Sequence, residues 1–243
     1  NNTAQNTNNN LTPKRDQFDT QTLPVEVHEN IYLCDGNIVG DSGESGIIEL
    51  TGSATTHELT SNSEDNTMGH VVLNDGNDAQ LQRDVRFSDF TLSTGIMDIQ
   101  EHRMTVDSGR IQGSGFGDGK MIMTNGESSA KGLQLFFTVE SVNYPSDTRM
   151  AFYPVGVSGR YTPVEVLANG NNTTQGQGNL AIIPVDAVHP AVSNIIGALD
   201  YYWISKANFE NIDNSIITYL FYYDGTIPGS WFNPYVGYRN YQN

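Results

Sequence analysis

Residues 71–106 read VVLNDGNDAQLQRDVRFSDFTLSTGIMDIQEHRMTV, and short apolar segments alternate here with polar turns. The segments fall at 71–73, 85–87, 90–92, 97–99 and 104–106. Each segment is too short to show the roughly 3.6-residue periodicity of a helix. Asp-Gly pairs such as Asp75-Gly76 tolerate positive φ and close tight turns between strands. The stretch therefore predicts a succession of short β-strands.

The alternation of apolar and polar residues changes phase within this stretch. Val85 and Phe87 occupy odd positions. Phe90 and Leu92, which follow after Ser88-Asp89, occupy even positions. A bulge or corner produces such a slip while the apolar groups stay inward. Many short strands joined by corners are typical of a β-solenoid or a strongly bent sheet, although a plain sandwich also fits.

The chain changes character after about residue 130. Apolar residues alternate with their neighbours at Leu133, Leu135, Phe137 and Val139, as in a longer, half-buried strand. Further strand candidates lie at 161–167, 180–185, 201–205 and 216–223. Their wider spacing and larger side chains favour a β-sandwich. A short helix is expected at 188–199, where the apolar residues have helical spacing.

The sequence thus predicts an all-β fold, with a short-strand β-solenoid or bent-sheet amino-terminal half followed by a β-sandwich-like carboxy-terminal half. Four parts are expected along the chain. They are a polar tail or linker at 1–25, a β-solenoid-like region at 26–130, a β-sandwich-like domain at 131–226 and an aromatic segment at 227–243.

Composition argues against several classes of function. Lysine and arginine total 12 against 28 aspartates and glutamates, a formal net charge of −16. Nucleic acids and anionic membranes would repel such a chain, so neither is an expected partner. The longest apolar run, at 216–223, is too short for membrane insertion. The five histidines are scattered and no Gly-x-Ser-x-Gly element is present, so we expect no enzymatic activity.

An acidic turn is the strongest candidate for a metal site. Asp75, Asp78 and Asn77 offer the carboxylate and amide oxygens that calcium prefers. The full Asp-x-Asn-x-Asp-Gly loop is absent, and solvated turn residues are the alternative interpretation. No cofactor is therefore expected, and calcium is the one ion that these turn residues could hold.

Five large aromatic residues gather near the end of the sequence: Trp231, Phe232, Tyr235, Tyr238 and Tyr241. Together their rings can bury on the order of 1,000 Å². A monomer rarely leaves so large an apolar patch exposed. We therefore expect these residues to be assembly or ligand contacts, covered by their own sandwich, by a neighbouring subunit or by a stacked glycan.

The order of motifs resembles a known class of protein. VVLNDGN at 71–77, FSDFTLSTGIMDI at 87–99 and GSGFGDG at 113–119 are followed by FYPVG at 152–156 and YYWIS at 201–205. This succession is similar to repetitive modules of large bacterial surface proteins exported by the type IX secretion route. The resemblance implies an extracellular, cell-surface β-rich module that is structural or adhesive.

Two functions follow from these observations. The first is an extracellular structural subunit of a bacterial surface filament or adhesin stalk. It would assemble through its terminal segments with copies of itself, as a homopolymer, or with other surface proteins. The alternative is a calcium-assisted carbohydrate-binding module, in which the aromatic residues at 231–241 stack on glycans.

Overall fold

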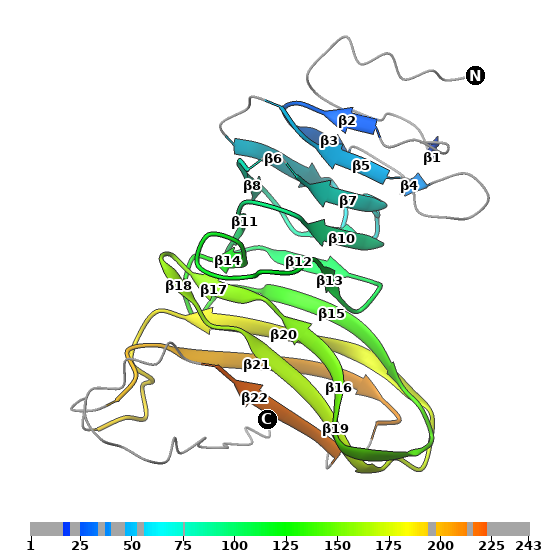
Figure 1. Ribbon diagram of the computed structural model, residues 1–243, viewed down its shortest axis with the longest axis vertical. Coiled ribbons are helices and arrows are strands. Elements are labelled where there is room, and N and C mark those ends of the chain that lie inside the picture. Colours follow the sequence, from blue (N-terminus) through cyan, green and yellow to red (C-terminus); the bar gives the residue numbers. More distant parts are fainter. Residues whose placement is uncertain are drawn as a thin grey trace.

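The computed structural model describes residues 17–19, 25–33, 37–39, 47–52, 56–74, 76–193, 198–212 and 216–222. The regular elements in these ranges are β-strands, and none of the described residues lies in an α-helix. The all-β prediction is therefore confirmed. Figure 1 shows a column of short strands above a broader base of long strands.

The column is built from parallel sheets. The first contains, in spatial order, β13 (Ile111–Gln112), β10 (Asp89–Leu92), β7 (His70–Leu73), β5 (Ile47–Leu50) and β2 (Val25–Val27). The second contains β17 (Val155–Val157), β14 (Ile122–Thr124), β11 (Met97–Gln100), β8 (Asp78–Leu81), β6 (Thr56–Ser61) and β3 (Ile31–Leu33). The third begins with β9 (Val85–Phe87), β12 (Arg103–Val106) and β15 (Gly132–Val139).

Two smaller pairings complete this half of the molecule. β18 (Arg160–Tyr161) lies antiparallel to β17 at the end of the second sheet. β1 (Gln17–Asp19) and β4 (Asn37–Val39) form a separate parallel pair.

The chain visits the three sheets in turn, so successive coils stack on one another. β7, β8 and β9 form one coil, and β10, β11 and β12 form the next. Between these coils Val71 lies opposite Phe90, and Leu73 lies opposite Leu92. All four side chains are fully buried. Equivalent residues of neighbouring coils therefore stack in register, as in a β-solenoid, and each coil buries its apolar face against the next.

The change of phase at Ser88-Asp89 lies at a corner of the coil. β9 ends at Phe87 in the third sheet, and β10 begins at Asp89 in the first. The rings of Phe87 and Phe90 meet across this corner edge to face, with their centroids 5.2 Å apart. Because the chain turns here, both strands direct their apolar side chains inward despite their opposite phase.

The base consists of two antiparallel layers (Figure 1). In one layer β15 pairs with β20 (Gly176–Val185), which pairs in turn with β21 (Tyr202–Glu210). In the other, β19 (Val164–Asn171) lies between β16 (Asn143–Tyr153) and β22 (Ile217–Phe221). Contacts cross between the layers: the buried Tyr153 hydroxyl donates to the Leu180 carbonyl oxygen at 2.8 Å.

Strand β15 joins the column to the base. Its first half pairs in parallel with β12, and the same strand pairs antiparallel with β20. One hydrophobic cluster runs from Val27 in the first sheet to Ile217 in β22. The change from parallel to antiparallel pairing in the third sheet thus begins close to the predicted boundary at 131. The division into separate domains stays a prediction.

The short helix predicted at 188–199 is wrong for its described residues, 188–193 and 198–199. The chain turns there instead. The amide of Ala191 donates to His189 Nδ1 at 3.1 Å, and the amide of Val192 donates to the His189 carbonyl oxygen at 2.9 Å. These bonds close a tight turn at Pro190 in place of a helical first turn. Elsewhere in the described ranges, too, no helix has the length and apolar character needed to cross a membrane.

Candidate functional site

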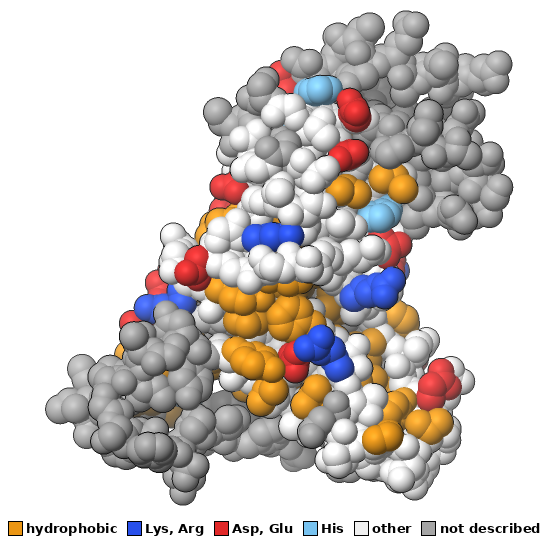
Figure 2. Space-filling view, in the orientation of Figure 1, with side chains coloured by type: hydrophobic (Ala, Val, Ile, Leu, Met, Phe, Trp, Pro, Cys, Tyr) orange, Lys and Arg blue, Asp and Glu red, His pale blue; other side chains and the backbone are white. Residues whose placement is uncertain are grey.

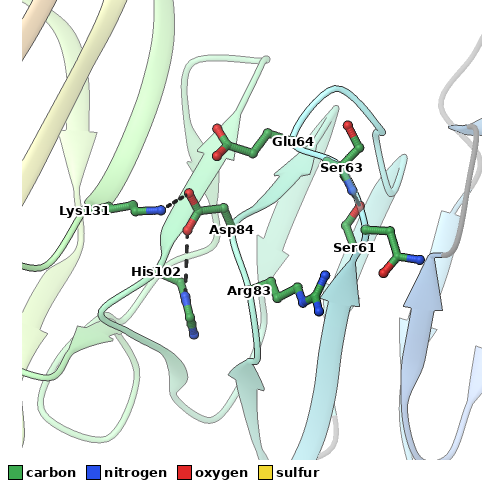
Figure 3. A pocket seen from close by; sticks show the side chains of 8 residues that line it. Ser61, Ser63, Glu64, Arg83, Asp84, His102 and Lys131 are labelled. Carbon is green, nitrogen blue, oxygen red and sulfur yellow. Dashed lines mark hydrogen bonds and ion pairs between the residues drawn. The ribbon is translucent and has the colours of Figure 1, made fainter.

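A polar pocket of about 260 Å³ lies at one corner of the column and is open to solvent (Figure 3). It is lined by turns from successive coils. The end of β6 and the turn after it supply residues 61–64, the turn between β8 and β9 supplies Arg83 and Asp84, and His102 lies between β11 and β12. Lys131 directly precedes β15. Stacking of the coils therefore assembles the pocket from segments that are distant in the sequence.

Asp84 lies at the centre of this site and is only 8% exposed. Lys131 Nζ donates to Asp84 Oδ2 at 2.6 Å, and the Arg103 backbone amide donates to Oδ1 at 3.0 Å. His102 Nδ1 lies 3.8 Å from Oδ1. Burial by itself raises the pKa of the Asp84 carboxyl, but the hydrogen bonds from Lys131 and Arg103 outweigh it, so this pKa lies below its ordinary value.

A second ion pair closes the rim of the pocket. Arg103 Nη1 donates to Glu64 Oε2 at 2.9 Å, which links the turn after β6 to β12. Arg83 is exposed, and within the described part of the chain it has no ion-pair partner. The lining residues Asp84 and Lys131 thus pair with each other and Glu64 pairs with Arg103, so these contacts join turns of different coils.

The polar contacts of this site join neighbouring turns to one another. The Ser61 hydroxyl donates to the Ser63 carbonyl oxygen at 2.7 Å, so it is occupied in closing its own turn. Among the lining residues no hydroxyl is paired with a general base, which nucleophilic catalysis requires. Asp84 instead accepts hydrogen bonds from Arg103, at the start of β12, and from Lys131, just before β15. These bonds connect both strands to the turn that contains Asp84.

Replacing Asp84 with asparagine is expected to lower the free energy of unfolding at pH 7 by about 1–2 kcal/mol. Hydrogen bonds to a charged group contribute about 1.5–3 kcal/mol, and solvent screening of Lys131, which is 47% exposed, reduces that value. The pKa of Asp84 is lowered by folding, so its contribution is present above the unfolded-state pKa of about 4 and is lost as the pH falls through the folded-state value.

Urea unfolding at a series of pH values from neutral to acidic measures this effect. The two proteins should differ at neutral pH and converge in acid. The matched control is Asp107→Asn, because Asp107 accepts from Arg86 at 2.9 Å at a more exposed position. Exposed pairs of this kind contribute only about 0–1 kcal/mol. Equal losses for both variants would contradict the role given to Asp84.

Of the residues predicted to bind calcium, Asn77 directly precedes β8 and Asp78 is the first residue of that strand. Asp78 Oδ1 accepts a hydrogen bond from the Ile96 amide at 2.8 Å. Asn77 Nδ2 donates to the Gly52 carbonyl oxygen at 3.2 Å. Both side chains therefore connect neighbouring coils, while Asp75 lies outside the described residues. Within the described ranges, no group of three or more His, Cys, Asp or Glu side chains could hold a metal, and calcium binding stays a prediction.

The predicted aromatic contacts lie outside the described residues. This applies to Trp231, Phe232, Tyr235, Tyr238 and Tyr241. Their role as assembly or ligand contacts therefore stays a prediction, and so does the carbohydrate-binding alternative that depends on them.

Sequence reasoning did not identify Asp84, His102 and Lys131, because they lie far apart in the chain and form no motif together. Alignment of two similar stretches of the sequence could have placed Asp84 and His102 at equivalent positions. Leu81 precedes Asp84 by three positions, and Ile99 precedes His102 by three. In the column β8 and β11 pair in parallel, so the turns that follow them lie at the same corner.

Comparison with known proteins finds no matching family model, no matching curated protein and no matching solved structure. The resemblance to type IX surface modules accordingly stays a prediction. The functional argument rests on the geometry described above.

Proposed function

We propose that this chain is an extracellular structural subunit of a bacterial surface filament or adhesin stalk. It assembles with copies of itself or with other surface proteins, and it has no catalytic role. The observation that carries the proposal is a long, exposed edge strand in the base of the molecule, β21.

Strand β21 is nine residues long and pairs with β20 on one side. On its other side it has no strand partner among the described residues. Its four central residues, 205–208, are all exposed. An exposed edge of this length presents a row of unpaired backbone groups, and a further strand can satisfy them.

The column supports a mechanical role. Its strands satisfy their backbone hydrogen bonds with the coils above and below, so the body is elongated and internally bonded (Figure 1). Polar side chains add links along the column. Asp78 and Asp84 each accept a backbone amide from the following coil. A load along the column is therefore shared among many hydrogen bonds.

Exposed apolar side chains concentrate in the later half of the chain. Six large hydrophobic residues among those described are exposed, and all except Ile47 follow residue 140. The five are Val142, Val192, Leu199, Leu220 and Tyr222. Figure 2 shows hydrophobic side chains gathered on the lower part of this face, below the column. Association through the base is consistent with this distribution.

Negative-stain imaging and light scattering of the full chain over a concentration series test the proposal. We expect species larger than one chain whose share of the mass rises with concentration, together with elongated particles or linear arrays. A strictly monomeric particle at the highest concentration reached would contradict it.

A further inference from the structure

We propose that β21 is a self-association edge. Two copies of the chain join their β21 strands antiparallel about a twofold axis at Asn208. The sheet of β15, β20 and β21 then continues across the interface into the second copy. This inference rests on the proposed function, and it names the contact surface and the partner.

The backbone of β21 is available for this pairing. The strand pairs with β20 from Tyr202, opposite Val185, to Glu210, opposite Gln177. In an antiparallel ladder, the backbone groups of alternate residues point away from the neighbour already bound. These groups face outward along the whole strand, since no described strand lies on that side.

The charges of β21 identify the partner. Lys206 and Glu210 are its only charged residues, and they lie on the same face because they are separated by an even number of positions. Both are exposed, and neither has an ion-pair partner within the described ranges. Their neighbours on β20 are Ala181 and Gln177, which carry no charge.

Only one symmetric register satisfies both charges. With the twofold axis at Asn208, residues equally distant from it lie opposite one another. Lys206 then lies opposite Glu210 of the second copy, and Glu210 lies opposite Lys206 of the second copy. An axis at Lys206 would instead place two like charges together, and an axis at Ala207 would pair Lys206 with Asn208. Opposite charges directly across an antiparallel pair are stabilising, whereas like charges are destabilising.

A lone lysine on an edge strand ordinarily opposes further pairing. In this register Lys206 opposes every partner except one that offers a carboxylate at the matching position. The edge is therefore selective for a second copy of this chain over an unrelated neutral strand.

Charge exchange tests the proposal by sedimentation over a concentration series. Lys206→Glu and Glu210→Lys each create two like-charge contacts, and each is expected to raise the dimer dissociation constant by about tenfold to a hundredfold. The double variant K206E/E210K restores both pairs with their signs exchanged and should return close to the original constant. Arg110→Glu is the matched control, because Arg110 is exposed on the column and has no ion-pair partner in the described ranges.

A disulfide tests the register directly. Cys34 is the single cysteine of the chain, so Cys34→Ala provides a cysteine-free background. Asn208→Cys in this background should form an intermolecular disulfide on oxidation, because residues directly opposite lie within bridging distance. Ser205→Cys should not, since two copies of residue 205 would lie about 20 Å apart in this register.

The outcomes separate this inference from the proposed function. Assembly that is unaffected by both single charge changes, or that is not restored in K206E/E210K, would overturn the β21 interface and leave the proposed function standing. A chain that remains monomeric throughout would overturn both. Disulfide formation at residue 205 in place of residue 208 would overturn the register.

Discussion

Replacing Phe87 with alanine is expected to lower the free energy of unfolding by about 3–5 kcal/mol. The Phe87 side chain is fully buried at the end of β9. Its removal leaves a cavity at the corner between two sheets, and it deletes the edge-to-face contact with Phe90 at 5.2 Å. Aromatic pairs of this kind contribute about 0.5–1.5 kcal/mol beyond their buried area. Stability is lost because the stacked coils cannot close the cavity unless neighbouring strands move out of register.

Urea unfolding followed by circular dichroism measures this change as a lower transition midpoint. The matched control is Phe136→Ala, because Phe136 is a half-buried phenylalanine in β15, between the buried residues Leu135 and Phe137. The decrease in the free energy of unfolding should be much smaller for Phe136→Ala than for Phe87→Ala. Similar shifts for the two variants would show that the corner at Phe87 is not part of a packed core.

Replacing Gly95 with alanine is expected to cost about 2–4 kcal/mol. Gly95 has φ of +73°, in the left-handed region that side chains disfavour. A Cβ atom there would overlap the backbone carbonyl oxygen of Asn77 in the preceding coil. Relief of this overlap would require the coils to separate, and it would disturb the hydrogen bond from the Ile96 amide to Asp78.

Thermal unfolding provides the measurement for this variant. Gly119→Ala is the control, because a Cβ atom added at Gly119 meets nothing within 4 Å. We expect Gly95→Ala to melt at a clearly lower temperature, whereas Gly119→Ala should stay close to the original protein. A Gly95→Ala protein of unchanged stability would mean that the two coils do not approach as closely as described.

The short strands of the column were predictable because their signals are local. The segments predicted at 71–73, 85–87 and 97–99 correspond to β7, β9 and β11, with at most one residue of difference at either end. Alternation of apolar residues and Asp-Gly turns depends only on neighbours in the chain. The helix predicted at 188–199 is absent from the described part of that range, residues 188–193 and 198–199. Its apolar spacing is helical, but residues 189–192 form a turn that is closed by the bonds from the Ala191 and Val192 amides to His189.

The polar site was not predictable in this way. Asp84 and Lys131 are 47 residues apart, and their ion pair exists only because β9, β12 and β15 lie side by side. The coils between them differ in length: Val85 pairs with Met104, which is 19 residues later, whereas Met104 pairs with Leu133, which is 29 residues later. This uneven period hides the alignment of Lys131 with the corner at Asp84 from a reading of the sequence.

From the sequence alone one could determine the all-β class, the positions of many strands and the net negative charge. These properties follow from composition and from interactions between near neighbours. Only the tertiary structure decided which strands pair, which turns meet around Asp84, and that β21 is left as an exposed edge carrying Lys206 and Glu210. Strand pairing is set by contacts between residues far apart in the chain, and such contacts leave no mark on the local pattern of either partner.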